Sequence, residues 1–185
     1  MHELILLRHA EAVPIETSGD DLQRPLSARG EQEAQAAGLW LAAHGLRPDR
    51  VLCSPTRRTD ETTRLALAAI DNAPVPQQAD EIYDATPGEL LALLDQHADV
   101  GTVLLVGHNP GMERLVALLV EGVATQHRHR PTPVETRPVP GACPQQVDER
   151  AVVPVGVCVC LRESAGDDAR AELPFADVRH RLAVE

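Results

Sequence analysis

The architecture of this chain follows from Glu3-Leu4-Ile5-Leu6-Leu7-Arg8-His9-Ala10-Glu11, an apolar run that ends abruptly in polar residues. An unbroken apolar run of this kind indicates a strand that is buried on both faces of a sheet. Such a strand would deliver Arg8 and His9 to one edge of that sheet. Arginine offers a rigid fork of donors to phosphoryl oxygens, and a neutral histidine can attack phosphorus through a ring nitrogen. The pair therefore indicates phosphate chemistry at this edge.

Length and charge limit the classes of protein that fit. The chain has 185 residues, which predicts one domain spanning residues 1–185. It carries 17 Lys and Arg against 28 Asp and Glu, a formal net charge of -11, which disfavours binding to nucleic acid or to anionic membranes. The early apolar run from Leu4 to Leu7 has no basic flank and is short. It predicts neither a signal peptide nor a membrane span, so we expect a cytoplasmic protein.

Two more apolar runs end in polar residues. The run at residues 50–54 leads into Thr56-Arg57-Arg58 and a predicted helix to about residue 70. The run at residues 102–106 leads into Gly107-His108-Asn109-Pro110 and a predicted helix to about residue 120, which Asn109 would cap. Three such strand–loop–helix units predict an α/β fold of three layers. Its central sheet would be mostly parallel, with helices on both faces and a ligand crevice at the carboxyl edge.

The remaining segments give weaker predictions. A polar loop at residues 14–24 precedes Ser27, the expected N-cap of a helix through about residue 44, and residues 86–89 match a capping box. The proline-rich segment at about 121–154 predicts an irregular excursion. Within it, the run at residues 127–130 is expected to be a solvated basic loop rather than a metal site. A strand is expected at residues 156–161, and the tail after it is left open as an edge strand or a short helix.

Three motifs together resemble those of the histidine phosphatase superfamily, with its phosphoglycerate-mutase-like fold. They are Leu7-Arg8-His9-Ala10-Glu11, Ser54-Pro55-Thr56-Arg57-Arg58 with Thr62, and Val106-Gly107-His108-Asn109-Pro110. The resemblance covers about residues 3–120.

The resemblance implies a role for each matching residue. His9 would be the nucleophile that is transiently phosphorylated, Arg8 and Arg58 would clamp the phosphate, and His108 would be a further donor to it. Arg24 lies in Asp21-Leu22-Gln23-Arg24-Pro25-Leu26-Ser27. There it resembles an additional phosphate-contacting arginine of the short, SixA-like phosphohistidine phosphatases.

The general acid is the least determined member of this set. Cleavage of an ester requires a proton for the departing alkoxide, and Glu81 is the candidate best placed by the resemblance, with Asp84 and Glu11 behind it. A phosphohistidine substrate would ease this requirement, because imidazole leaves more readily than an alkoxide. Guanidinium groups and a histidine can neutralise phosphoryl charge by themselves, so no metal and no other cofactor is expected.

The spacing of the motifs bears on the substrate. Each interval between them has room for only a single helix and its loops, which predicts an open, shallow site that would admit a phosphorylated side chain on a protein surface. The first hypothesis is a phosphatase that removes phosphate from phosphohistidine on a partner protein in signal transduction. The alternatives are a phosphatase or mutase of small phosphate esters, with the proline-rich segment as a lid, and a non-catalytic phosphate-binding module.

Overall fold

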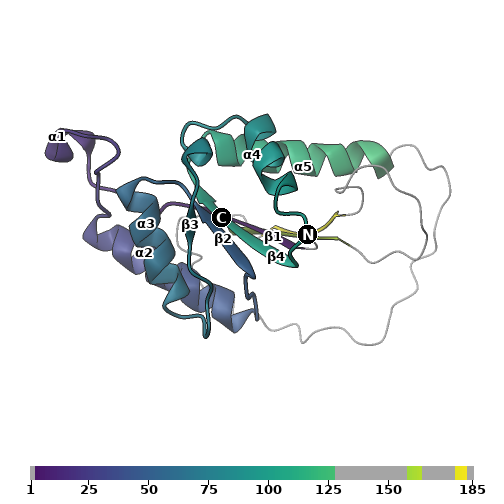
Figure 1. Ribbon diagram of the computed structural model, residues 1–185, viewed down its shortest axis with the longest axis horizontal. Coiled ribbons are helices and arrows are strands. Elements are labelled where there is room, and N and C mark those ends of the chain that lie inside the picture. The colour runs from purple at the N-terminus through teal and green to yellow at the C-terminus, as the bar shows by residue number, and fades with distance from the viewer. Residues whose placement is uncertain (1–2, 128–157, 164–177, 183–185) are drawn as a thin grey trace.

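A mixed sheet forms the centre of the computed structural model, which describes residues 3–127, 158–163 and 178–182 (Figure 1). Four parallel strands lie side by side in the order β3 (Gln77–Gln78), β2 (Arg50–Cys53), β4 (Thr102–Gly107) and β1 (Glu3–Arg8). Beyond β1 the sheet continues in antiparallel orientation with β5 (Cys158–Glu163) and β6 (Val178–Leu182). The predicted, mostly parallel sheet is confirmed. Of the two alternatives for the tail, the described residues show the edge strand, which is β6.

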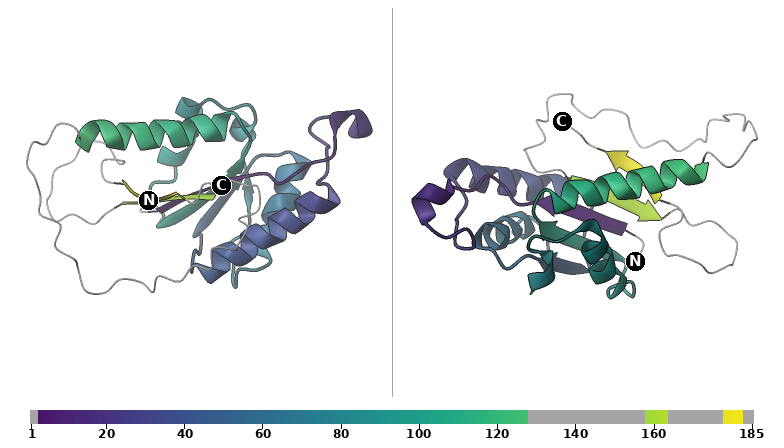
Figure 2. Two further views of the ribbon diagram at one scale, coloured as in Figure 1. Left: turned by 180° about the vertical axis from the view of Figure 1, so that it is seen from behind. Right: turned by 90° about the horizontal axis from the view of Figure 1, so that it is seen from above.

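Helices cover both faces of this sheet (Figures 1 and 2). One face carries α2 (Ala28–Ala43) and α3 (Arg57–Leu67), and the other carries α4 (Pro87–Asp95) and α5 (Gly111–His127). Side chains of β1 alternate between the two cores: Leu4 and Leu6 are buried with those of α4 and α5, whereas Ile5 and Leu7 are buried with those of α2 and α3. The three-layer α/β prediction is therefore confirmed.

The predicted helix starts are also observed. The Ser27 side chain accepts a hydrogen bond from the Gly30 amide at the start of α2. The reciprocal bonds between Thr86 and Glu89 complete the capping box of α4. Thr56 caps α3 by accepting a hydrogen bond from the Thr59 amide. The free amides at the start of that helix point toward the carboxyl edge of the sheet.

Three predictions need correction. The loop at residues 14–24 contains a one-turn helix, α1 (Ile15–Ser18), closed by Gly19 with a left-handed φ of 73°. Asn109 does not hold the predicted cap position, because α5 begins at Gly111 and Pro110 directly precedes it; the Asn109 side-chain amide donates to a carboxylate oxygen of Glu113. The expected excursion at about 121–154 starts later, because α5 continues to His127.

The longer α5 has a simple cause. The segment from residue 121 to residue 127 contains no proline, and the first proline of the excursion is Pro131, so nothing interrupts the helix before its observed end. The rest of the predicted excursion, including most of the run at residues 127–130, lies outside the described residues. The single-domain expectation for residues 1–185 therefore stays a prediction. Among the helices in the described part of the chain, none is long and apolar enough to cross a membrane.

Candidate active site

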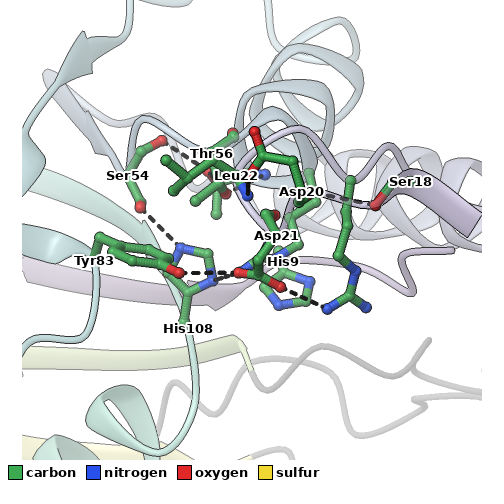
Figure 3. Close-up of polar contacts among 12 residues, drawn as sticks. His9, Ser18, Asp20, Asp21, Leu22, Ser54, Thr56, Tyr83 and His108 are labelled. Carbon is green, nitrogen blue, oxygen red and sulfur yellow. Dashed lines mark hydrogen bonds and ion pairs between the residues drawn. The ribbon is translucent and has the colours of Figure 1, made fainter. Parts of the chain in front are cut away.

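The polar residues that follow the parallel strands meet at the carboxyl edge of the sheet (Figure 3). His9 follows β1 and His108 follows β4, and their ring centroids lie 5.1 Å apart. The His9 amide donates to the Gly107 carbonyl at 3.0 Å, and the Ser54 amide donates to the Val106 carbonyl at 3.1 Å. The hydrogen bonds of the sheet thus continue past the strand ends. They fix the backbone of His9, Ser54 and His108 relative to one another.

The tautomer of His9 follows from its contact with the chain. Nδ1 of His9 lies 2.8 Å from the Ala10 carbonyl oxygen. A carbonyl oxygen only accepts, so Nδ1 carries the proton and Nε2 of the neutral ring holds the lone pair. Burial lowers the pKa of His9 to about 4, and the charges of Arg58, Arg8 and Arg24 act in the same direction, against the raising effect of the Ala10 hydrogen bond. His9 is therefore neutral at pH 7, with a lone pair on Nε2.

The turn after His9 is tied to two helices. The Ala10 amide donates to Oγ1 of Thr62 in α3 at 3.1 Å. That hydroxyl in turn donates to the carbonyl of Arg58 in the same helix at 2.7 Å. At the start of α2, a Cβ on Gly30 would lie 1.9 Å from the Glu11 carbonyl oxygen, so only glycine permits this approach. These contacts hold the backbone that carries His9.

His108 lies between two polar partners. Its Nε2 is 2.8 Å from Ser54 Oγ, and its Nδ1 is 3.3 Å from Nη2 of Arg58. A guanidinium only donates, so Nδ1 accepts and Nε2 carries the proton that is donated to Ser54. Burial, followed by the proximity of His9 and Arg58, lowers the pKa of His108 to about 3. Donation from His108 to a phosphoryl oxygen stays a prediction, and it would require one of these two bonds to open.

Asp21 bridges two of the predicted phosphate-binding arginines. Arg58, which is buried, donates through Nη2 to Oδ2 of Asp21 at 2.9 Å and through Nη1 to its backbone carbonyl. Arg24 donates through Nη1 to Oδ1 of Asp21 at 2.9 Å, and through Nε to the Val13 carbonyl at 2.9 Å. The hydroxyl of Tyr83 donates to Oδ2 of Asp21 at 3.0 Å. Asp21, Tyr83, His9 and His108 lie close together in Figure 3.

Two guanidinium nitrogens at this edge are buried without a partner. They are Nε of Arg8 and Nε of Arg58, and neither has a hydrogen bond to any described residue. Buried donors are nearly always satisfied in folded proteins. Phosphate oxygens are partners that guanidinium groups bind through such donors.

The three predicted general acids lie apart from this cluster of contacts. Glu81 is exposed in the short helix η1 (Asp80–Ile82) and makes no hydrogen bond or ion pair within the described part of the chain. Asp84 is exposed at a left-handed φ of 54°. Glu11 accepts from the Ser27 hydroxyl at 2.6 Å and lies 3.8 Å from Arg29. The acid role of Glu81 therefore stays a prediction without a supporting contact.

Comparisons with known proteins agree with this site. The model of the histidine phosphatase superfamily (branch 1) matches residues 4–84, which include Arg8, His9 and Arg58. An uncharacterized protein of Mycobacterium tuberculosis is 39% identical over 114 residues, which cover 61% of this chain and 69% of that protein. The structure of a SixA-type protein from Nakamurella is 30% identical, with a TM-score of 0.70, over 98% of this chain and 94% of that one.

The chain belongs to the histidine phosphatase superfamily. The phosphohistidine phosphatase SixA of Escherichia coli is 27% identical over 126 residues, which cover 65% of this chain and 75% of that protein. The resemblance to the SixA-like members is thereby confirmed.

Three polar residues of this histidine phosphatase site have contacts that sequence reasoning did not assign. The motif that contains Ser54 assigns it no role, yet its hydroxyl holds His108. For Asp21, the one signal in the sequence is its spacing of three residues from Arg24. Tyr83 reaches Asp21 across 62 positions of sequence, and no local pattern marks such a contact. Among the described residues, no group of three His, Cys, Asp or Glu side chains is placed to hold a metal ion.

Proposed function

We infer that this histidine phosphatase removes phosphate from phosphohistidine on a partner protein, with His9 as the nucleophile. The observation that carries the proposal is the state of His9. Its Nδ1 proton is held by the Ala10 carbonyl, its Nε2 has no hydrogen bond to any described residue, and its pKa of about 4 keeps the ring neutral beside three arginines. The proposal includes a cytoplasmic role in signal transduction.

The reaction would proceed in two displacements. Nε2 of His9 attacks phosphorus while the P–N bond of the substrate breaks, and the departing imidazole keeps the electron pair and takes a proton from water. Water then attacks the phosphorus of phosphorylated His9, the P–Nε2 bond breaks, and orthophosphate leaves with neutral His9 restored. Arg8 and Arg58 would neutralise the equatorial oxygens through their unpaired Nε donors, without a metal ion.

The acid–base state of the site favours a nitrogen-bound phosphate over an ester. The carboxylate that joins the arginines, Asp21, has its pKa lowered to about 2 by its hydrogen bond to Arg24 first, and by those to Tyr83 and Arg58. It is ionised at neutral pH and cannot protonate an alkoxide. An imidazole leaving group needs less assistance, which agrees with the substrate named for the Escherichia coli relative.

The test is hydrolysis, with chelator present, of a phosphohistidine protein beside a panel of small phosphate esters. We expect preferential loss of phosphohistidine with the wild-type chain and a loss of activity of at least about 10³-fold in His9→Ala. His44→Ala is the matched control, because His44 is exposed and its Nδ1 bonds only the Trp40 carbonyl within its own helix end. Circular dichroism checks that each variant is folded.

Each other outcome removes a stated part of the proposal. Turnover of esters alone would leave the fold and the nucleophile and replace the substrate by a small phosphate ester. Retained activity in His9→Ala would remove the nucleophile, and loss of activity with chelator would remove metal independence. Binding of phosphate without any turnover would favour the non-catalytic module.

A further inference from the structure

Both carboxylate oxygens of Asp21 accept hydrogen bonds from other side chains of the protein. Its two side-chain oxygens and its carbonyl oxygen accept five hydrogen bonds, which come from Arg24, Arg58 and Tyr83. Its side chain is nevertheless 31% exposed, so it lies at the mouth of the site rather than in the core. These contacts join the loop before α2 to the start of α3 and to the end of η1 (Figure 3).

This arrangement constrains the two arginines in a specific way. Arg58 directs both terminal nitrogens at Asp21 and keeps Nε unpaired and buried. Arg24 uses Nε for Val13 and Nη1 for Asp21, which leaves Nη2 outside its described hydrogen bonds. An arginine side chain loses much rotamer freedom when it is fixed, and two guanidinium groups repel one another. A carboxylate between them offsets both costs before any ligand arrives.

Tyr83 extends the same arrangement to His108. Its hydroxyl donates to Asp21, and its ring packs edge-on against the His108 ring with centroids 5.6 Å apart. The hydrogen bond to Asp21 raises the pKa of Tyr83, so the phenol keeps the proton that it donates. One side chain therefore contacts both the bridging carboxylate and the histidine that accepts from Arg58.

We propose that Asp21, supported by Tyr83, is a positioning residue that holds Arg24 and Arg58 in the geometry that binds a phosphoryl group. The inference rests on the proposed function only in taking phosphate as the ligand. Asp21 itself touches no reacting atom. Its negative charge acts against anion binding, and its contribution is the fixed placement of two cations.

The test measures orthophosphate binding directly, by calorimetry, in the full chain. We expect Asp21→Asn to weaken orthophosphate binding by about tenfold and to raise KM by a similar factor with a smaller change in kcat, because a neutral amide oxygen holds guanidinium groups less strongly. Tyr83→Phe should act in the same direction by about threefold. Asp21→Glu keeps the charge and should restore part of the affinity.

Asp20→Asn is the matched control. Asp20 is the neighbouring carboxylate, and its Oδ1 accepts only from the Leu22 amide, which an asparagine oxygen can also do. This variant removes the same charge one residue away without touching either arginine, so it should bind orthophosphate as the wild type does. Thermal unfolding verifies that the variants are folded.

Several results would overturn the inference. If Asp21→Asn binds orthophosphate equally or more tightly, the carboxylate does not position the arginines and instead repels the anion. An equal loss in Asp20→Asn would show a general charge effect. Should Asp21→Asn fail to fold, unchanged affinity in a folded Tyr83→Phe would overturn the proposal. Because binding of orthophosphate needs no turnover, failure of the proposed phosphohistidine activity would leave this test intact.

Discussion

An arginine–histidine contact lies near each of the two ends of the neighbouring strands β2 and β4. At the amino ends, Nη1 of Arg50 lies 2.7 Å from Nδ1 of His97. At the carboxyl ends, Nη2 of Arg58 lies 3.3 Å from Nδ1 of His108. The same two residue types therefore meet near both ends of this strand pair, although Arg58 belongs to α3 and His97 lies between α4 and β4.

The two contacts differ in their surroundings. Arg50 has a side chain that is 25% exposed, and it also pairs at 3.4 Å with the exposed carboxylate of Asp99. Arg58 has a side chain that is only 6% exposed, and its buried Nε has no partner among the described residues. Burial lowers the pKa of both histidines. A lowered histidine pKa beside an arginine therefore does not by itself mark a site, whereas a buried donor without a partner does.

The largest expected difference between the two ends is in catalysis. Arg58→Met should lower kcat/KM for phosphohistidine by about 10³-fold, because it removes a charge from the developing transition state. Arg50→Met removes a partly exposed pair and should leave kcat/KM within about twofold and cost under about 1 kcal/mol of stability. Steady-state kinetics and urea unfolding measure both effects. Equal losses in the two variants would erase the distinction between the ends.

The titration of the histidines gives an intermediate effect. By NMR, the imidazole of His9 should titrate near pH 4 rather than near its ordinary value of 6.5. Removal of a nearby positive charge stabilises imidazolium, so Arg58→Met should raise the pKa of His9 and His108, and Arg50→Met should raise that of His97 alone. If either variant raised the pKa of histidines at both ends of the strand pair, the two ends would not be electrostatically separate.

The same pKa values set the dependence of stability on pH. Below pH 6.5 the unfolded chain takes up protons that His9 and His108 do not take up in the folded state, so stability falls as the pH drops from 6.5 toward 4. At pH 5, His9 alone should account for a loss of roughly 2 kcal/mol in the free energy of unfolding. Urea unfolding at pH 7 and pH 5 measures this loss, and equal stability at the two pH values would refute it.

The smallest expected effect on activity concerns how α3 supports the backbone that carries His9. Thr62→Val removes the acceptor of the Ala10 amide and should cost about 1–3 kcal/mol of stability, with a loss of activity of a few fold as His9 moves. Thr63→Val, one residue later, removes a bond to the Thr59 carbonyl within the same helix and a weak contact with Cys53. It should cost less and leave kcat unchanged. If both variants behave alike, Thr62 has no special link to His9.

The parts of this molecule that sequence could predict are those fixed by local rules. Burial of Leu4 to Leu7 on both faces of the sheet followed from the apolar run, and the caps at Ser27 and Thr86 followed from side-chain chemistry. Because parallel strands align their carboxyl ends, the proximity of His9 and His108 could be expected before any coordinates.

The parts that escaped prediction depend on loop paths. The Asp21 carboxylate accepts from Arg58, 37 positions later in the sequence, and from Tyr83, 62 positions later. No periodic pattern in the sequence indicates either contact. The residues 15–18 show no apolar periodicity long enough to indicate the single turn of α1. The end of α5 was missed because the proline-rich composition of the whole segment masked the helical first seven residues.

The pairing of β1 with β4 joins Glu3 to Thr102, and so brings together residues that are almost one hundred positions apart. The chain must close this long loop before His9 and His108 can meet, and such closure is slow compared with the formation of any one helix. The helices α2, α3 and α4 all lie within the closed loop. We therefore expect the pair of His9 and His108 to form late in folding. A nascent chain that lacks β4 already contains Arg8, Arg24 and Arg58 but not yet His108.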